Sequence, residues 1–135
     1  MQFDTKIAVV LREDLPTWQK LNMTAFLVSG IAATPDVLGA DYEDATGNLY
    51  LPMFVQPVMI FAATADQIRQ VYQRLSKQQV RFSVFTEELF STGHDEANRA
   101  AVKAVPADAL KLTGLAVRAR KKLVDTALKG LPLHE

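Results

Sequence analysis

The run KIAVVLR at residues 6–12 decides the fold. It is continuously apolar between two basic ends and rich in β-branched residues, which is typical of a strand covered on both faces. Such a strand needs helices on both sides of its sheet. The next residues, Glu13-Asp14-Leu15-Pro16, form an acidic turn whose proline favours the start of a helix.

The rest of the chain alternates predicted helices and strands. The predicted helices cover Trp18 to about Ala33, 65–79, 94–105 and 120–129, and the further strands cover 57–63, 80–86 and 110–118. Thr64 is expected to cap the second helix, and Thr92 with Asp95 resembles a capping box before the third. Gly130 and Pro132 end the last helix. This alternation predicts one α/β domain over residues 1–135, a three-layer α/β/α sandwich with a mostly parallel sheet.

A long irregular connection at residues 34–56 follows the first helix. The second half of that helix, AFLVSGIAA, is apolar nearly all round and is expected to be buried. Within 34–56, turn signals alternate with a short predicted strand at 49–51 and with large apolar residues. The large apolar residues are Leu38, Tyr42, Leu49, Tyr50, Leu51, Met53 and Phe54. Because the core or another chain must cover this surface, we expect the segment to be mobile or partner-dependent, and the chain to form a homodimer.

Composition excludes several classes of protein. The 135-residue chain contains no cysteine, which excludes disulfide frameworks, thiolate zinc sites and a cysteine nucleophile. It contains no dinucleotide fingerprint, phosphate-binding loop or nucleophile elbow, so we expect no cofactor. No segment is apolar enough to span a membrane, and the first residues do not resemble a signal peptide. We therefore expect a cytoplasmic protein without a membrane partner.

Charge is balanced overall but unevenly distributed. The chain has 15 basic and 15 acidic residues, and this balance disfavours nucleic acid as a partner. Residues 1–66 hold three Lys or Arg against eight Asp or Glu, whereas residues 111–135 hold six against two. The basic residues near the end, Arg118, Arg120, Lys121 and Lys122, form either a phosphate contact or a solvated helix face.

Polar side chains gather where the predicted strands end. In open α/β sheets, ligands bind outside the carboxyl ends of the strands. Arg12 and Asp14 follow the first strand there, and Lys20 lies early in the next helix. Thr86, Glu87 and Glu88 follow the third strand. We predict one crevice holding Arg12, Asp14, Lys20 and Thr86, with Lys20, Thr86 and Glu87 as catalytic candidates. Candidate ligand-binding residues are Arg12, Asp14, Asn22, Thr24, Glu88 and His94. The alternative is that these are solvated turn residues.

Two of these candidates have specific chemistry. Lys20 and Thr24 are four residues apart and share a helical face, which suits a carbonyl or phosphate ligand, or a first turn still in water. His94 is either a general base or part of a capped helix start. A metal site would need a second histidine at ligand spacing; His134 lies in the tail, so no metal site is predicted.

Several stretches resemble a known family. They are IAVVLREDL, QKLNMTAFLVSGI, FTEELFSTGHDEANRAAV, LKLTGLAVR and the terminal KGLPL. Together they resemble a family catalogued as a domain of unknown function, number two thousand, over nearly the whole chain. That family in turn looks like a divergent relative of type II peptidyl-tRNA hydrolase. The resemblance implies a four-stranded mixed sheet between helices, with one strand antiparallel.

The resemblance also implies a site. In those hydrolases a lysine on the first helix works with an aspartate and a threonine after the third strand. Lys20 takes the place of that lysine, and Thr86, Glu87, Glu88 and Thr92 stand where the family has Asp-Ala-Gly-x-Thr. Three functions stay open: a small-ligand-binding or hydrolase-like protein at the strand-end crevice, an ester hydrolase on peptidyl- or aminoacyl-tRNA, and a non-catalytic dimeric interaction module. The neutral charge disfavours tRNA.

Overall fold

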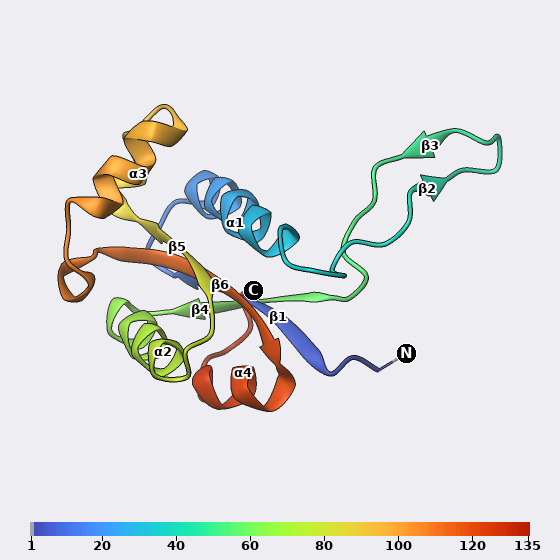
Figure 1. Ribbon diagram of the computed structural model, residues 1–135. Helices are drawn as coiled ribbons and strands as arrows, with labels where there is room; N and C mark the ends of the chain where they lie inside the picture. The colour runs from blue at the N-terminus through green and yellow to red at the C-terminus, as the bar shows by residue number, and fades with distance from the viewer. Residues whose placement is uncertain (1) are drawn as a thin grey trace.

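The computed structural model describes residues 2–135 and is built on a four-stranded sheet. The strand order is β4 (Val58–Ala63), β1 (Thr5–Arg12), β6 (Leu112–Arg120) and β5 (Phe82–Thr86). β1 pairs in parallel with β4, whereas β6 runs antiparallel to both β1 and β5. One strand therefore runs against the other three, which confirms the expected mixed sheet (Figure 1).

Helices cover both faces of this sheet. α1 (Thr17–Ala32) lies on one face, and α2 (Ala65–Lys77) and α4 (Lys121–Ala127) lie on the other (Figure 1). Alternate residues of β1 enter the two cores: Ile7 and Val9 pack in the α1 core, and Ala8 and Val10 pack in the α2–α4 core. The prediction that 6–12 is covered on both faces is confirmed, since residues 7–10 have no exposed surface.

The helix ends follow local capping chemistry. Thr64 caps α2 as predicted: its hydroxyl accepts from the Gln67 N–H, and the Gln67 side chain accepts in return from the Thr64 N–H. The capping box predicted from Thr92 and Asp95 is wrong. α3 (Asp95–Lys103) is capped by His94, whose Nδ1 accepts from the Ala97 N–H at 3.2 Å.

Some boundaries move by a few residues. α2 ends at Lys77, and Gln79 takes a left-handed conformation with φ 58°. β5 therefore begins at Phe82 rather than 80. β6 covers 112–120 rather than 110–118, and α4 covers 121–127 rather than 120–129. Two short 3₁₀ helices, Glu87–Phe90 and Ala107–Ala109, lie in the remaining connections.

A hairpin projects from the body after α1. β2 (Tyr42–Glu43) and β3 (Leu49–Tyr50) form a separate two-stranded antiparallel sheet. We call residues 38–54 the arm. A backbone bridge between Leu38 and Phe54 closes its base, and Figure 1 shows its tip standing away from the central sheet. The short predicted strand at 49–51 is thus half of a hairpin.

Side chains beyond the arm fix its base to the sheet. The Gln56 side chain donates to the Thr5 carbonyl at 2.9 Å and accepts from Arg118 Nε at 3.2 Å. Arg118 also donates to the Pro35 carbonyl at 2.8 Å. The arm therefore leaves the body from anchored ends, and Arg118, one of the basic residues near the chain end, is engaged in this anchor.

The outer face of α1 is exposed, contrary to the expectation that the second half of this helix is buried all round. Met23, Leu27 and Ile31 face the core. Phe26, however, is 55% exposed, and Ala25 and Ser29 are exposed as well. The helix has a buried apolar side and an exposed apolar side, because no element of the described chain packs over its outer face. No helix within residues 2–135 has both the length and the apolar character needed to cross a membrane.

Candidate functional site

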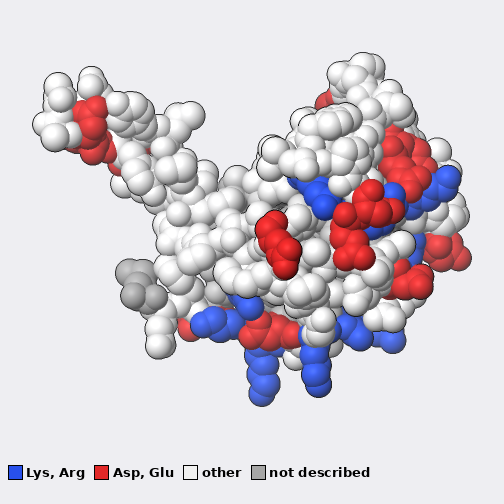
Figure 2. Space-filling model, turned by 180° about the vertical axis from the view of Figure 1, so that it is seen from behind, with Lys and Arg blue, Asp and Glu red and all other residues white. Residues whose placement is uncertain are grey.

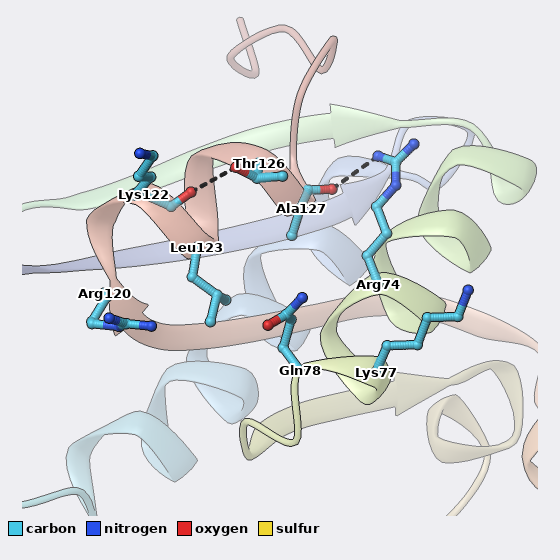
Figure 3. Close-up of a pocket in the computed structure, with 8 residues that line it drawn as sticks. All are labelled: Arg74, Lys77, Gln78, Arg120, Lys122, Leu123, Thr126 and Ala127. Atoms are coloured by element: carbon cyan, nitrogen blue, oxygen red, sulfur yellow. Dashed lines mark hydrogen bonds between the residues drawn. The ribbon is translucent and has the colours of Figure 1, made fainter.

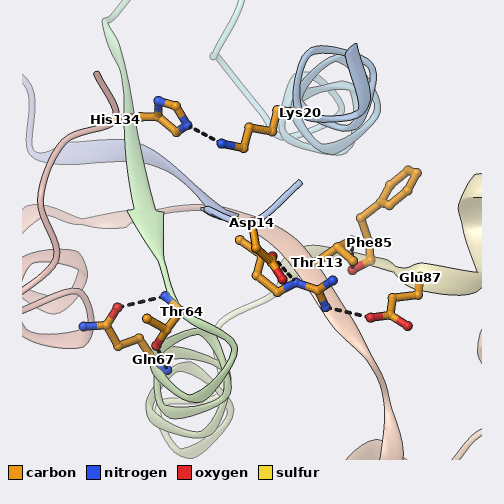
Figure 4. Close-up of polar contacts among 9 residues, drawn as sticks. Asp14, Lys20, Thr64, Gln67, Phe85, Glu87, Thr113 and His134 are labelled. Atoms are coloured by element: carbon orange, nitrogen blue, oxygen red, sulfur yellow. Dashed lines mark hydrogen bonds and ion pairs between the residues drawn. The ribbon is translucent and has the colours of Figure 1, made fainter. Parts of the chain in front are cut away.

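The structure joins three of the predicted site residues at the ends of β1 and β5. Arg12, the last residue of β1, donates from Nε to Asp14 at 2.7 Å and from Nη1 to Glu87 at 2.8 Å. Glu87 follows β5 at the start of a 3₁₀ helix, and its carboxylate reaches Arg12 although β6 lies between β5 and β1 (Figure 4). Strand ends that are far apart in sequence are thus linked through one guanidinium.

Arg12 forms ion pairs with both neighbouring carboxylates, Asp14 and Glu87. Partial burial opposes the charged guanidinium, but the hydrogen bonds and charges of Asp14 and Glu87 outweigh it, so the pKa of Arg12 is raised. Arg12 therefore stays charged, and each carboxylate already has a cationic partner. One carboxylate oxygen of Glu87, Oε1, is thereby engaged by Arg12.

Thr86 lies at the same strand end but points into the protein. Only 1% of its surface is exposed. The pairing of β5 with β6 shifts register between Phe85 and Thr86, and the Thr113 hydroxyl donates to the Phe85 carbonyl at 3.0 Å. A hydroxyl buried in this way does not reach a ligand without movement of the strand end.

Lys20 belongs to a different polar group. Its Nζ lies 3.1 Å from His134 Nε2, and the other ring nitrogen of His134 lies 2.9 Å from the backbone oxygen of Glu135. Because a backbone oxygen only accepts, Nδ1 carries the proton in this arrangement and Nε2 accepts from the lysine. No hydrogen bond or ion pair in residues 2–135 joins Lys20 to Arg12, Asp14 or Glu87, and Figure 4 shows Lys20 and His134 apart from Asp14 and Glu87.

The tail brings His134 to Lys20. Residues 132–134 lie along β4: the Ala62 N–H donates to the Pro132 carbonyl at 3.1 Å, and the His134 N–H donates to the Ile60 carbonyl at 2.8 Å. Sequence reasoning missed His134, because three residues after a Gly-Leu-Pro turn carry no periodicity that predicts pairing with a strand.

The remaining candidates lie elsewhere. The Thr24 hydroxyl donates to the Lys20 carbonyl at 2.7 Å within α1, and Asn22 is exposed on that helix. Glu88 lies in the 3₁₀ helix, where its carbonyl accepts from Ser91. His94 caps α3, so one ring nitrogen is occupied. Among residues 2–135, no three histidine or carboxylate side chains converge in a way that could hold a metal ion.

A second candidate site is the apolar surface formed by the arm and the outer face of α1. An open groove with a volume of about 310 Å³ separates the two. Its lining is almost wholly apolar: Ala25, Val28, Ser29, Ala32, Leu38, Met53 and Phe54. The arm extends this surface with Leu51, which is 85% exposed.

Asp44 holds the turn of the arm. Its carboxylate accepts from the N–H groups of Thr46 and Asn48, from the Asn48 side chain at 3.0 Å and from the Tyr50 hydroxyl at 2.7 Å. The bond from Tyr50 is the largest cause that lowers the pKa of Asp44 to about 2, and the same bond raises the pKa of Tyr50. Gly47 supplies the left-handed conformation of the turn, with φ 93°.

Comparison with known proteins places the chain in a family. The model of the family described as Protein of unknown function (DUF2000) matches residues 5–135. The chain belongs to this family. It is also similar to the structure of a protein of unknown function, Atu0240, from Agrobacterium tumefaciens strain C58. The two are 46% identical, the match covers 99% of this chain and 100% of that chain, and the TM-score is 0.95. The curated proteins include no match.

The match confirms the resemblance to the family of unknown function, and it does not extend to the type II peptidyl-tRNA hydrolases. Neither the family's description nor that of the similar structure names an activity, so the function has to be argued from this chain's own surfaces.

Proposed function

We propose that this chain is an interaction module that forms a homodimer through the arm and the outer face of α1. The observation that carries the proposal is the exposure of the arm. Ten large apolar side chains between 43% and 85% exposed lie on these two elements and at the arm base. They are Trp18, Leu21, Phe26, Leu38, Tyr42, Leu49, Tyr50, Leu51, Met53 and Val55.

The extent of this surface favours a partner. Monomeric proteins rarely expose contiguous apolar patches beyond a few hundred Å². The ten side chains offer on the order of 800 Å², about what one partner contributes to an interface of standard size. Full burial of one such side chain stabilises by about 1.5–3 kcal/mol, so a few of them are enough to offset the cost of association.

A second copy of the chain is the partner that this shape favours. Each chain carries a projecting arm and, beside its base, an apolar groove lined by α1 and by the arm. In a two-fold dimer the same surface serves both chains, so the arm of each chain contacts the groove of the other and the contact occurs twice. The groove volume of about 310 Å³ suits one or two side chains of the size of Leu51 or Met53.

The arm is already folded for this role. The bonds to Asp44 close its turn, and those of Gln56 and Arg118 fix the chain at its base. A two-stranded hairpin alone is at best marginally stable in water. These hydrogen bonds stabilise the folded hairpin, and a partner that covers its apolar side chains would stabilise it further. Preorganisation lowers the entropy that the arm loses on docking.

The test replaces one apolar side chain on the arm and one away from it. We expect Leu51→Ser to weaken the dimer by about tenfold or more, because burial of this leucine is lost. Leu133→Ser is the matched control: Leu133 is 54% exposed and lies in the tail, away from the arm. Sedimentation velocity over a concentration series measures both. Equal dissociation constants for the two variants would contradict the proposed interface.

A second candidate function is small-ligand binding at Lys20, and the contact with His134 favours it. The neutral ring orients the ammonium, which is suited to the oxygen of a carbonyl or carboxylate ligand. Hydrolysis is not favoured, because Thr86 is buried and Glu87 is paired with Arg12. The peptidyl-tRNA alternative needs Lys20 together with these two residues.

NMR titration with a small carboxylate, N-acetylglycine, tests this second site. We expect saturable shifts at the His134 ring and at the amides of 17–21, and no such shifts in Lys20→Met. Shifts that persist in Lys20→Met would contradict a role for the ammonium. Hydrolysis of a peptidyl-tRNA analogue that is abolished by Lys20→Met would instead establish the hydrolase.

A further inference from the structure

A basic pocket lies between α2 and α4, on the face of the sheet opposite α1. Arg74 and Lys77 reach it from α2, and Arg120 and Lys122 reach it from the end of β6 and the start of α4 (Figure 3). Leu123 and Ala127 supply an apolar part of the lining, which also includes Gln78 and Thr126. The pocket volume is about 440 Å³.

Within residues 2–135, the four cations have no acidic partner. The lining contains neither Asp nor Glu. None of the ion pairs in residues 2–135 involves Arg74, Lys77, Arg120 or Lys122. The nearest acid along α4, Asp125, is paired with Lys6 at 2.6 Å. Like charges around one hollow repel one another, and a bound anion would relieve this repulsion.

The basic surface continues beyond the pocket. A neighbouring shallow groove is lined by Lys121, Lys122 and Lys129, together with Thr126 and the already paired Asp125. Figure 2 shows Lys and Arg side chains gathered along one edge of the molecule, whereas the projecting arm carries acidic side chains and no basic ones. A formally neutral chain therefore presents a strongly positive region.

One of the cations is held in place. Arg74 Nη1 donates to the Ala127 carbonyl at 3.1 Å, which fixes the guanidinium against the end of α4 (Figure 3). A guanidinium has five N–H donors, so this single bond leaves donors for a ligand. Positioned donors of this kind suit phosphate oxygens, which arginine binds in a bidentate manner.

We propose that the α2–α4 pocket binds a small phosphate-bearing molecule with an apolar or aromatic group, such as a nucleoside diphosphate. Four positive charges match a diphosphate, and Leu123 and Ala127 offer surface for the rest of the ligand. The proposal is independent of the dimer, because the pocket and the arm belong to different faces of the sheet.

The test uses ADP and inorganic pyrophosphate as probes, with binding measured by NMR at low ionic strength. We expect saturable shifts at the amides of 74–78 and 120–127, with ADP binding more tightly than pyrophosphate. Lys77→Gln combined with Arg120→Gln should weaken ADP binding about tenfold, because each lost cation removes an attraction that is weakly screened at low salt. Both residues are exposed, and Arg74 keeps its bond to α4. The single variant Lys122→Gln gives an independent second measurement.

The matched control is Lys103→Gln combined with Lys111→Gln, which removes the same charge from exposed positions outside the pocket. Equal weakening by this control would overturn the site in favour of non-specific attraction. Absence of saturation by ADP at about 10 mM would overturn it as well, because the dissociation constant would then exceed about 10 mM, too weak for a specific site. Binding confined to anionic phosphatidylserine vesicles or to a short RNA, with none to ADP, would replace the small molecule by a membrane or by nucleic acid.

Discussion

Asp44 holds the arm together at the scale of a single residue, and its titration gives a prediction. Its folded pKa of about 2 lies below the ordinary value of 3.8, so the ionised form is the one that the turn binds. The stabilisation is therefore fully present above pH 3.8 and is lost as pH falls toward 2. We expect the arm amides to lose protection from hydrogen exchange in that window, and Asp44→Ala to show the loss at neutral pH. An arm that exchanges equally at pH 4 and pH 2 would show that Asp44 does not hold it.

Individual residues also show which contacts the sequence could predict and which it could not. Arg12, Asp14 and Glu87 could be predicted to meet, because parallel strand ends fall on one edge of a sheet. The burial of Thr86 follows from a register shift inside the β5–β6 pair, which the sequence does not record. His94 rather than Thr92 caps α3 because the helix begins at Asp95, and the sequence does not fix how many residues separate it from the preceding 3₁₀ helix.

At the scale of elements, Gly114 sets the distance between α1 and β6. A Cβ at this position would lie 2.7 Å from Met23 Sδ and 3.2 Å from the Val10 carbonyl oxygen. We therefore expect Gly114→Ala to lower the free energy of unfolding by about 1–3 kcal/mol, as overpacked cores do. Gly93→Ala is the control, since a Cβ there meets nothing within 4 Å. Denaturation in urea measures both, and equal stability of the two variants would mean that α1 can shift without cost.

The elements themselves were largely readable from the sequence. Each major strand and helix was predicted within a few residues, because buried runs such as KIAVVLR and the helical spacing of Ile68, Val71 and Leu75 carry strong periodicity. The arm was expected only as a loop with a short strand. Its partner strand at Tyr42–Glu43 is two residues long, too short for any pattern. The second half of α1 was predicted to be buried, and it is partly exposed, because an apolar sequence does not show whether the same chain or another covers it.

At the scale of the whole molecule, charge and apolar surface divide the protein into distinct regions. The outer face of α1 and the arm are apolar, with acidic side chains on the arm, and the α2–α4 pocket is lined by basic side chains. The sequence indicated this division through its acidic first half and basic end, and the fold places the acidic arm and the basic pocket on separate elements. Arg118 is the exception, since it belongs to the basic end of the chain and serves the base of the arm.

The molar mass of the wild-type protein in solution tests the central proposal most directly. The interface proposed here predicts that sedimentation equilibrium gives twice the chain mass of 14.9 kDa at micromolar concentrations, shifting toward 14.9 kDa on dilution. A mass of 14.9 kDa at every concentration, up to about 1 mM, would contradict the proposal. Two arm–groove contacts of this size should give a dissociation constant well below about 1 mM.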